Sequence, residues 1–515
     1  MMPTEKGSGT KAAKGGSIPK SESTSSTATT IEPSTPTTME PTTSETQPLL
    51  AGSSSSSQDQ PSKGDSLSRQ IFLSIILIVP CIAPGMSFGY SAVALDQLPL
   101  TISQSSWFAS LVFIAAPIGS LLSGPTLDKV GRKPALILTG VVGLIGWLLI
   151  TYSLTITNLF IGRFLTGISQ GLAATPSTIY IAESIVVHNT KLRGSLASWS
   201  VVAQTFGILQ VYFMGSLLRY RKVAAMGAII SGLGVLLIAF IIPESPAWLN
   251  SKGRRGDAEW AARRLRLGPP TTQTEPTSRG DAEAGTSGQE SMSTSNIFKE
   301  FMKPEAYKPL LILSLFFLFQ QFSAVTVIIT YMVDFIRSSG FHILNPYFIT
   351  VIAGLIIFAS TISISFILPT TGVKPLSAAS GAGIAVSMFV IGIYLLFEKA
   401  PVINFEWGFF NLIPLAALIL NIVASSVGFL PIPYVMLGEV FPMQIKGVAA
   451  GLATCLAYIF SFLAVKTYPY LHIMLGNGIF FFYGLVAALG TAHVLAYLPE
   501  TKGKSLDEIM REFSS

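Results

Sequence analysis

Twelve long apolar runs constrain the fold of this chain more than any other feature of its sequence. A run of about 18 or more apolar residues is long enough to cross a bilayer as a helix. Backbone groups in lipid must find their hydrogen bonds within the segment, so each run predicts a transmembrane helix. The runs lie at about 71–95, 106–127, 135–154, 158–183, 194–218, 223–242, 308–335, 347–369, 375–397, 408–437, 447–471 and 476–498. We therefore expect an all-α membrane protein.

The composition agrees with this class and excludes several others. Charged residues make up 12% of the chain, whereas soluble proteins carry about a quarter. The net charge of +6 does not indicate a nucleic-acid partner, because the bases lie in short loops between the runs, as orientation signals do. The sequence contains no recognisable nucleophile triad, phosphate loop or metal-ligand cluster. We expect neither an enzyme nor a cofactor or metal site.

The runs form two groups of six, which predicts two six-helix bundles. Parallel halves of this kind are typical of transporters, with the substrate site near the midplane between them. The loops that hold most of the Lys and Arg should be cytoplasmic, although Arg219 and its neighbours count against this. The expected parts are a disordered cytoplasmic tail (1–66), an N-terminal bundle (67–242), a cytoplasmic linker (243–307), a C-terminal bundle (308–498) and a cytoplasmic tail (499–515).

The N-terminal tail contains one pattern with a possible cellular role, ETQPLL (45–50). Glu45 followed by Leu49 and Leu50 fits an acidic dileucine signal, which sorting adaptors would bind. The alternative is an inert tail, since such short patterns are common by chance. We expect a multi-pass protein of the plasma membrane, with an endosomal or lysosomal membrane as the alternative.

Two loops at matching places in the halves differ in charge. The first, GPTLDKVGRKP (124–134), contains an acid and three bases, whereas the second, LPTTGVKPL (368–376), keeps only a Gly and a Lys. Asp128 can accept hydrogen bonds from a helix N-terminus, and Arg132 can bind a carboxylate through two hydrogen bonds. The alternative is that these charges only hold the loop on the cytoplasmic side.

A set of short motifs, in register across about 70–510, resembles the sugar porter family of the major facilitator superfamily. Within that family the chain looks most like the facilitated trehalose and glucose transporters of insects, including VKTYPYL (465–471). The other segments are GPTLDKVGRKP (124–134), GRFLTGISQG (162–171), IYIAES (179–184), KLRGSLAS (191–198), PESPAWL (243–249), QQFSA (320–324), GEVFPMQIKG (438–447) and LPETKGKSLDEI (498–509).

The resemblance implies alternating access, in which the two bundles rock around a central site. It also implies a network of ion pairs at cytoplasmic helix ends that breaks when the inner gate opens. Because the second loop reads Val373 at an Arg position, the C-terminal half should lack most of its clamp. Either the inner gate is weaker, or the N-terminal clamp suffices. The expected network comprises Asp128, Arg132, Arg163, Glu183, Arg193, Glu244, Glu439, Lys446 and Glu500.

The resemblance also implies a site for sugar hydroxyls, which this chain keeps in part. Gln320, Gln321, Thr326, Tyr434 and Tyr458 stand at substrate-binding positions of the family. Three other polar positions of the family are apolar here, at Val201, Ile357 and Ala457. A site that lacks these groups gains less from a polyol.

Proton-coupled relatives carry an Asp in span one where this chain has Ser91, and an intramembrane acid is what a proton relay requires. Asp96, near the outer end, is the alternative. We therefore predict a facilitative, uncoupled transporter of a hexose or trehalose. The alternatives are a transporter of a less polar solute, or a sugar sensor that does not transport.

Overall fold

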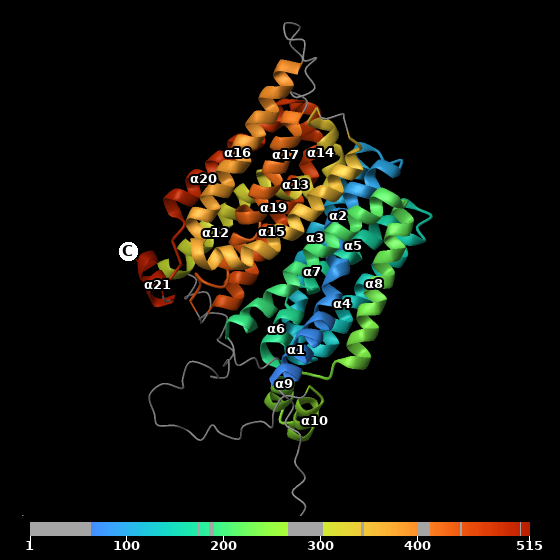
Figure 1. Cartoon of the computed structure of the whole chain (residues 1–515), viewed down its shortest axis with the longest axis vertical. Coiled ribbons are helices and arrows are strands. Elements are labelled where there is room, and N and C mark those ends of the chain that lie inside the picture. The colour runs from blue at the N-terminus through green and yellow to red at the C-terminus, as the bar shows by residue number, and fades with distance from the viewer. Residues whose placement is uncertain are drawn as a thin grey trace, which may run out of the picture. The chain divides into compact units, whose positions relative to one another are not determined.

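A computed structural model describes residues 63–173, 175–184, 190–265, 302–340, 344–398, 412–442, 445–504 and 506–514. These residues form helices joined by short loops, and the described part contains no strand. Figure 1 shows α2–α8 gathered in one group and α12–α20 in a second. Residues 1–62 of the predicted N-terminal tail and 266–301 of the predicted linker lie outside the described residues, while 63–66 belong to α1.

The N-terminal bundle contains the first six predicted spans. Its elements are α1 (Lys63–Ile78), η1 (Val79–Cys81), α2 (Ile82–Ala94) and η2 (Leu95–Gln97) in span one, then α3 (Ile102–Lys129), α4 (Arg132–Thr151), α5 (Ile156–Ala173) with α6 (Pro176–Ser184), α7 (Thr190–Leu217) and α8 (Tyr220–Ile241). Two short helices follow, α9 (Pro246–Ser251) and α10 (Arg255–Leu265).

The C-terminal bundle contains the other six spans. Its elements are α12 (Pro304–Phe322), α13 (Val325–Thr330) and α14 (Met332–Ser338) in span seven, then α15 (Pro346–Thr371), α16 (Val373–Glu398), α17 (Ile413–Ala424) with a π-helical turn η4 (Ser425–Phe429) and α18 (Ile432–Met436), α19 (Lys446–Leu475) and α20 (Gly478–Tyr497). The chain ends in α21 (Leu506–Ser514).

Ten helical stretches in the described chain are long and apolar enough to cross a membrane. The other two predicted spans, 158–183 and 308–335, are divided among shorter helices, α5 with α6 and α12 with α13 and α14. Together these give twelve spans in two six-helix bundles, so the predicted fold class is confirmed.

Several spans are broken within the membrane-spanning part of the chain, where irregular backbone is uncommon. Span seven breaks at Ala324, which is fully buried and has a φ of 71°, a left-handed conformation that costs a non-glycine residue energy. Span ten changes from α-helix to a π-helical turn before Pro431 and Pro433. Irregular backbone at membrane depth is tolerated where protein surrounds it or where it lines a cavity. These breaks therefore mark the interior faces of the C-terminal bundle.

Close helix packing explains some of the glycines in the apolar runs. A Cβ on Gly171 would lie 2.0 Å from the carbonyl oxygen of Ala116, and one on Gly119 would lie 2.1 Å from that of Ile168. Such distances are far below van der Waals contact, so α3 and α5 can approach this closely only without side chains there. Between the bundles, α3 packs on α19 and α7 packs on α15.

Candidate functional site

A chain of hydrogen bonds connects the break in span seven to the break in span ten. The Gln320 side-chain Nε2 donates to the carbonyl oxygen of Leu430 at 3.1 Å. Gln321 Nε2 donates to Gln320 Oε1 at 3.2 Å, and the Thr326 hydroxyl donates to Gln321 Oε1. The two glutamines and the threonine are buried. This is a preorganised row of amide and hydroxyl groups inside the C-terminal bundle.

Tyr434 lies beside this row, and Tyr458 lies near Tyr434. The Tyr434 ring meets the Phe317 ring edge to face, with centroids 5.0 Å apart, and Phe317 lies one helical turn before Gln320 and Gln321. Tyr434 and Tyr458 are close enough to interact electrostatically. Tyr434 is 37% exposed, whereas Tyr458 is 7% exposed. The structure thus brings all five predicted substrate-binding residues into one neighbourhood.

The N-terminal bundle contributes an amide pair that the sequence analysis missed. Gln170 of α5 donates through Nε2 to Gln204 Oε1 of α7 at 3.1 Å. Gln170 is 2% exposed, and within the described chain its Oε1 has no hydrogen-bond partner that meets normal geometry. Its side chain lies next to the Tyr458 hydroxyl of the other bundle. The Gln170 amide of the N-terminal bundle therefore meets Tyr458 of the C-terminal bundle.

The sequence did contain a signal for this pair. Gln204 comes three residues after Val201, so it lies on nearly the same helix face about one turn further along. Val201 itself is 52% exposed, while the other two apolar replacements, Ile357 and Ala457, are buried. The polar group expected in span five is thus displaced by one turn.

Arg163 does not lie with the other residues of the predicted cytoplasmic network, so its assignment to that network is wrong. It is 1% exposed, and its guanidinium donates to Ser91 Oγ at 2.7 Å, to the Ser87 carbonyl at 3.0 Å and to the Phe108 carbonyl at 3.3 Å. The physical reason is distance along the span, since the 20 residues between Arg163 and Glu183 would cover about 30 Å as a helix. All of these hydrogen-bond partners are neutral.

Asp128, Arg132, Glu183 and Glu244 of the predicted N-terminal network form one cluster at the end of this bundle opposite Arg163. Arg132 donates to Glu183 from Nε at 2.9 Å and from Nη2 at 2.7 Å, and Ser245 Oγ donates to the same carboxylate at 2.8 Å. Asp128 is 3.8 Å from the Arg132 guanidinium and its side chain is 77% exposed. An exposed pair at that distance contributes about 1 kcal/mol or less, so Glu183 is the main partner of Arg132.

Carboxylates cap the helix that follows the motif loop in each half. Glu244 accepts from the backbone N–H groups of Arg132 at 3.0 Å and Lys133 at 3.1 Å. In the second half, Glu500 accepts from the N–H groups of Val373 and Lys374, both at 3.1 Å. A carboxylate at a helix N-terminus accepts hydrogen bonds from the unpaired backbone N–H groups there and interacts favourably with the positive end of the helix dipole.

A glycine with positive φ precedes each capped helix. Gly131 has a φ of 120° and Gly372 a φ of 96°, a region that L side chains rarely adopt. A Cβ on Gly131 would also lie 2.4 Å from the Glu244 carboxylate. The second loop, which has few charged residues, has therefore kept the glycine and the carboxylate cap. Both of these features act through the backbone.

The second loop has lost the part that acts through side chains. Val373 stands where the first half has Arg132, and Glu439 stands where the first half has Glu183. In the described chain Glu439 Oε2 is buried and accepts no hydrogen bond. Lys446 has no ion-pair partner among the described residues, and the side chain of Arg193 lies outside them.

Replacing Val373 by arginine is expected to supply the missing partner of Glu439. Because Glu439 Oε2 is buried without a hydrogen-bond partner in the described chain, we expect the new pair to raise the free energy of unfolding by about 1 kcal/mol. Thermal unfolding of the purified protein measures this. Val373→Met, which adds length without charge, should give no such gain, and Glu439→Gln combined with Val373→Arg should remove it. A gain that survives Glu439→Gln would contradict the pairing.

The opposite end of the two bundles is joined by polar contacts. Asp96 of η2 accepts hydrogen bonds from Arg337 Nη2 of α14 at 2.9 Å and from the Tyr347 hydroxyl of α15 at 2.7 Å. Lys466 of α19 donates to Ser106 Oγ of α3 at 2.8 Å, and its Nζ lies 3.9 Å from the centroid of the Trp107 ring. These contacts join the two bundles at this end, whereas no ion pair joins them at the end that holds Glu183 and Glu500 within the described residues.

The remaining predicted residues fall outside the described chain. Glu45, Leu49 and Leu50 of the possible sorting signal precede residue 63, where the described part begins. The described residues contain no group of His, Cys, Asp and Glu that could hold a metal ion.

Comparison with known proteins places these features in a wider context. A family model described as sugar (and other) transporter matches residues 42–513. The chain is 30% identical over 455 residues to the facilitated trehalose transporter Tret1 of Apis mellifera ligustica, covering 86% of this chain and 88% of that protein. It is 28% identical to Tret1 of Polypedilum vanderplanki, again with 86% and 88% covered.

Solved structures share the fold. The inward open conformation of the xylose transporter XylE from E. coli superposes with a TM-score of 0.66 at 21% sequence identity, covering 86% of this chain and 99% of that one. The proton:xylose symporter XylE bound to 6-bromo-6-deoxy-D-glucose gives a TM-score of 0.63 at 20% identity, covering 87% and 100%.

Proposed function

Because this chain belongs to the sugar transporter family, we propose that it is a facilitative carrier that moves a hexose or trehalose by alternating access. The family consists of membrane transporters and not of enzymes. The names of the Tret1 relatives support trehalose as one substrate to test first. The uncoupled mechanism and the identity of the sugar are our proposals.

One observation carries the proposal, namely that both bundles hold buried amide groups and that Gln170 of the N-terminal bundle lies beside Tyr458 of the C-terminal bundle. A sugar hydroxyl both donates and accepts hydrogen bonds, and a glutamine amide offers both functions in one group. Gln170 and Gln204 would bind from the N-terminal bundle, and Gln320 and Gln321 from the C-terminal bundle. Tyr434 and Tyr458 would flank the ring, because aromatic faces pack well against the apolar faces of a sugar.

The gate contacts support an inward-facing arrangement. Asp96, Arg337 and Tyr347 join the outer ends, while the cytoplasmic clusters around Glu183 and Glu500 stay within their own bundles. A sugar bound between the amides of both halves would draw the bundles together, since a ligand shifts an equilibrium toward the state that binds it better. The outer contacts would then break as the cytoplasmic ends close.

The surroundings of Arg163 support transport without a coupled proton. A proton relay needs an ionisable acid at membrane depth. Here the Arg163 guanidinium is bound by the hydroxyl of Ser91 and by backbone carbonyls, none of which titrates in the physiological range. Asp96, the alternative acid, is already bound to Arg337 at the outer end. Sugar would therefore move only down its own gradient.

Uptake of radiolabelled trehalose and glucose into proteoliposomes that contain the purified protein tests this proposal. We expect saturable uptake at equal rates with and without a proton gradient. Uptake that requires the gradient would contradict the uncoupled mechanism. Folded protein that takes up neither sugar would contradict the substrate, and a screen of less polar solutes would follow, as Val201, Ile357 and Ala457 suggest. Binding of a sugar without uptake would favour a sensor.

We also propose that the protein lies in the plasma membrane with both termini in the cytoplasm, where sorting adaptors could reach Glu45, Leu49 and Leu50. The protein is a multi-pass membrane protein, and the excess of Lys and Arg on one set of loops supports this orientation. Imaging a tagged protein with Leu49→Ala and Leu50→Ala tests the signal, and an unchanged distribution would count against it.

A further inference from the structure

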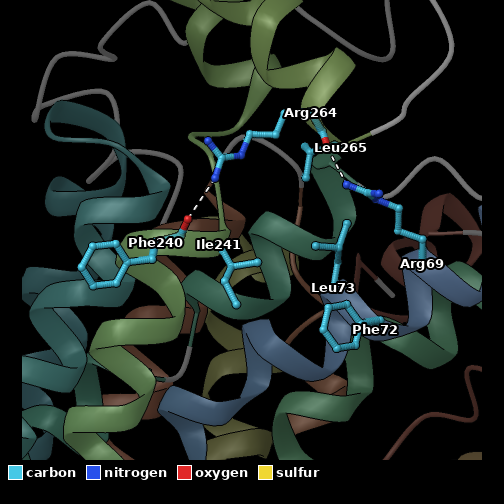
Figure 2. Close-up of a pocket in the computed structure, with 7 residues that line it drawn as sticks. All are labelled: Arg69, Phe72, Leu73, Phe240, Ile241, Arg264 and Leu265. Atoms are coloured by element: carbon cyan, nitrogen blue, oxygen red, sulfur yellow. Dashed lines mark hydrogen bonds between the residues drawn. The ribbon is translucent and has the colours of Figure 1, made fainter.

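A cavity of about 330 Å³ lies where α1, α8 and α10 meet, away from the amide groups of the proposed sugar site. Figure 2 shows Arg69 and Arg264 at one side of this cavity and the rings of Phe72 and Phe240 at the other. The cavity therefore has a cationic wall and an apolar wall. The transport mechanism proposed above uses neither.

The two arginines donate hydrogen bonds only to carbonyl oxygens in the described chain, and some of their N–H groups have no partner there. Arg69 Nη2 donates to the carbonyl oxygen of Arg264 at 3.0 Å, and Arg264 Nη2 donates to that of Phe240 at 2.9 Å. Arg69 Nε is buried without a hydrogen-bond partner in the described chain. A guanidinium has five N–H donors, so most of the donors at this wall remain available to an anionic ligand.

The charge around the cavity is positive. Arg264 is close enough to Lys133 for the two charges to repel each other. Glu244 attracts Lys133, but that carboxylate already accepts from the backbone N–H groups of α4. No acidic side chain lines the cavity. An anion placed there would relieve the repulsion among the cations.

The position of the cavity along the spans indicates which anion fits. Phe72 is 56% exposed and Phe240 is 74% exposed, and both belong to helices long and apolar enough to cross a membrane. Exposed aromatic rings on such helices face lipid, while arginines near the helix ends reach the headgroup level. The apolar wall thus lies at the acyl chains and the cationic wall at the headgroups.

We propose that this cavity binds the headgroup of an anionic membrane phospholipid, with Arg69 and Arg264 on its phosphate. Guanidinium groups bind phosphate and carboxylate oxygens through paired hydrogen bonds. The loop charges orient this end toward the cytoplasm, and anionic lipids are concentrated in the cytoplasmic leaflet. A bound lipid would connect α10 to α1 and α8. This inference does not depend on which solute is carried.

Binding of a fluorescent short-chain phosphatidylserine to the purified full-length protein in neutral detergent tests the site. We expect binding that phosphatidylcholine does not compete for. Each arginine removed near an anionic surface should weaken binding about fivefold, so Arg69→Gln with Arg264→Gln should weaken it about 25-fold. Arg69→Lys with Arg264→Lys keeps both charges and should retain most of the binding, which separates loss of charge from misfolding.

A charge-matched control distinguishes this cavity from general attraction. Arg255 and Arg263 are exposed arginines of α10 outside the cavity, and replacing both by glutamine should leave binding within about twofold. Equal losses in the two double variants would overturn the proposal, as would binding that phosphatidylcholine competes for equally. Inorganic phosphate is the last arm, because phosphate that binds as tightly as the lipid would assign the cavity to a soluble anion instead.

Discussion

Replacing Gln321 by alanine is expected to abolish most saturable sugar uptake. Gln321 is the middle member of the row, since it donates to Gln320 and accepts from Thr326. Its removal deletes a proposed contact to the sugar, and it takes one hydrogen bond each from Gln320 Oε1 and the Thr326 hydroxyl, both of which are buried. An unsatisfied buried polar group costs about 1–3 kcal/mol, which corresponds to about fivefold to 150-fold in apparent affinity.

Uptake kinetics in proteoliposomes, with the folded fraction measured in parallel, provide the test. Gln104→Ala is the matched control, because Gln104 caps the N-terminus of α3 rather than joining the row, and its uptake should remain close to that of the parent. Gln170→Ala should lower uptake as Gln321→Ala does if both bundles bind the sugar. Unchanged kinetics in folded Gln321→Ala protein would rule out this site.

Replacing Arg132 by glutamine is expected to destabilise the N-terminal bundle and to slow transport. Glu183 would retain only the Ser245 hydroxyl, and its side chain is 24% exposed, so solvent compensates in part. Deleting one partner of a fully buried pair costs about 3–5 kcal/mol. For this partly buried pair we expect the free energy of unfolding to fall by about 2 kcal/mol.

Thermal unfolding and uptake by Arg132→Gln measure both effects. Lys129→Gln removes the same charge from the same loop, and because Lys129 is exposed it should change neither quantity appreciably. If the two variants behave alike, the first loop only holds its charges on the cytoplasmic side, as the simpler interpretation of the motif has it. If only Arg132→Gln loses stability and uptake, the ion pair between Arg132 and Glu183 contributes to both.

Sequence patterns determined the fold because they report local physics. Each apolar run predicts one helix in lipid. The run must be helical because its backbone groups can find hydrogen bonds only within the segment. The motif glycines are equally local, since Gly131 and Gly372 form turns directly before the helices that follow them. For the same reason the sequence indicated which positions had lost their side chains, such as Val373.

The tertiary structure decided which of these groups meet. Gln170 and Gln204 are 34 residues apart, and they meet because α5 and α7 both pack against α2. Only this packing also brings Gln170 to Tyr458 of the other bundle. The Asp96–Arg337 contact joins residues 241 apart in the chain. Arg163 lies at the other end of its span from Glu183, so a motif that lists both residues cannot say that they share a site. A sequence period gives the helix and its faces, but the rotation and depth of each helix depend on its neighbours, because close packing allows few arrangements.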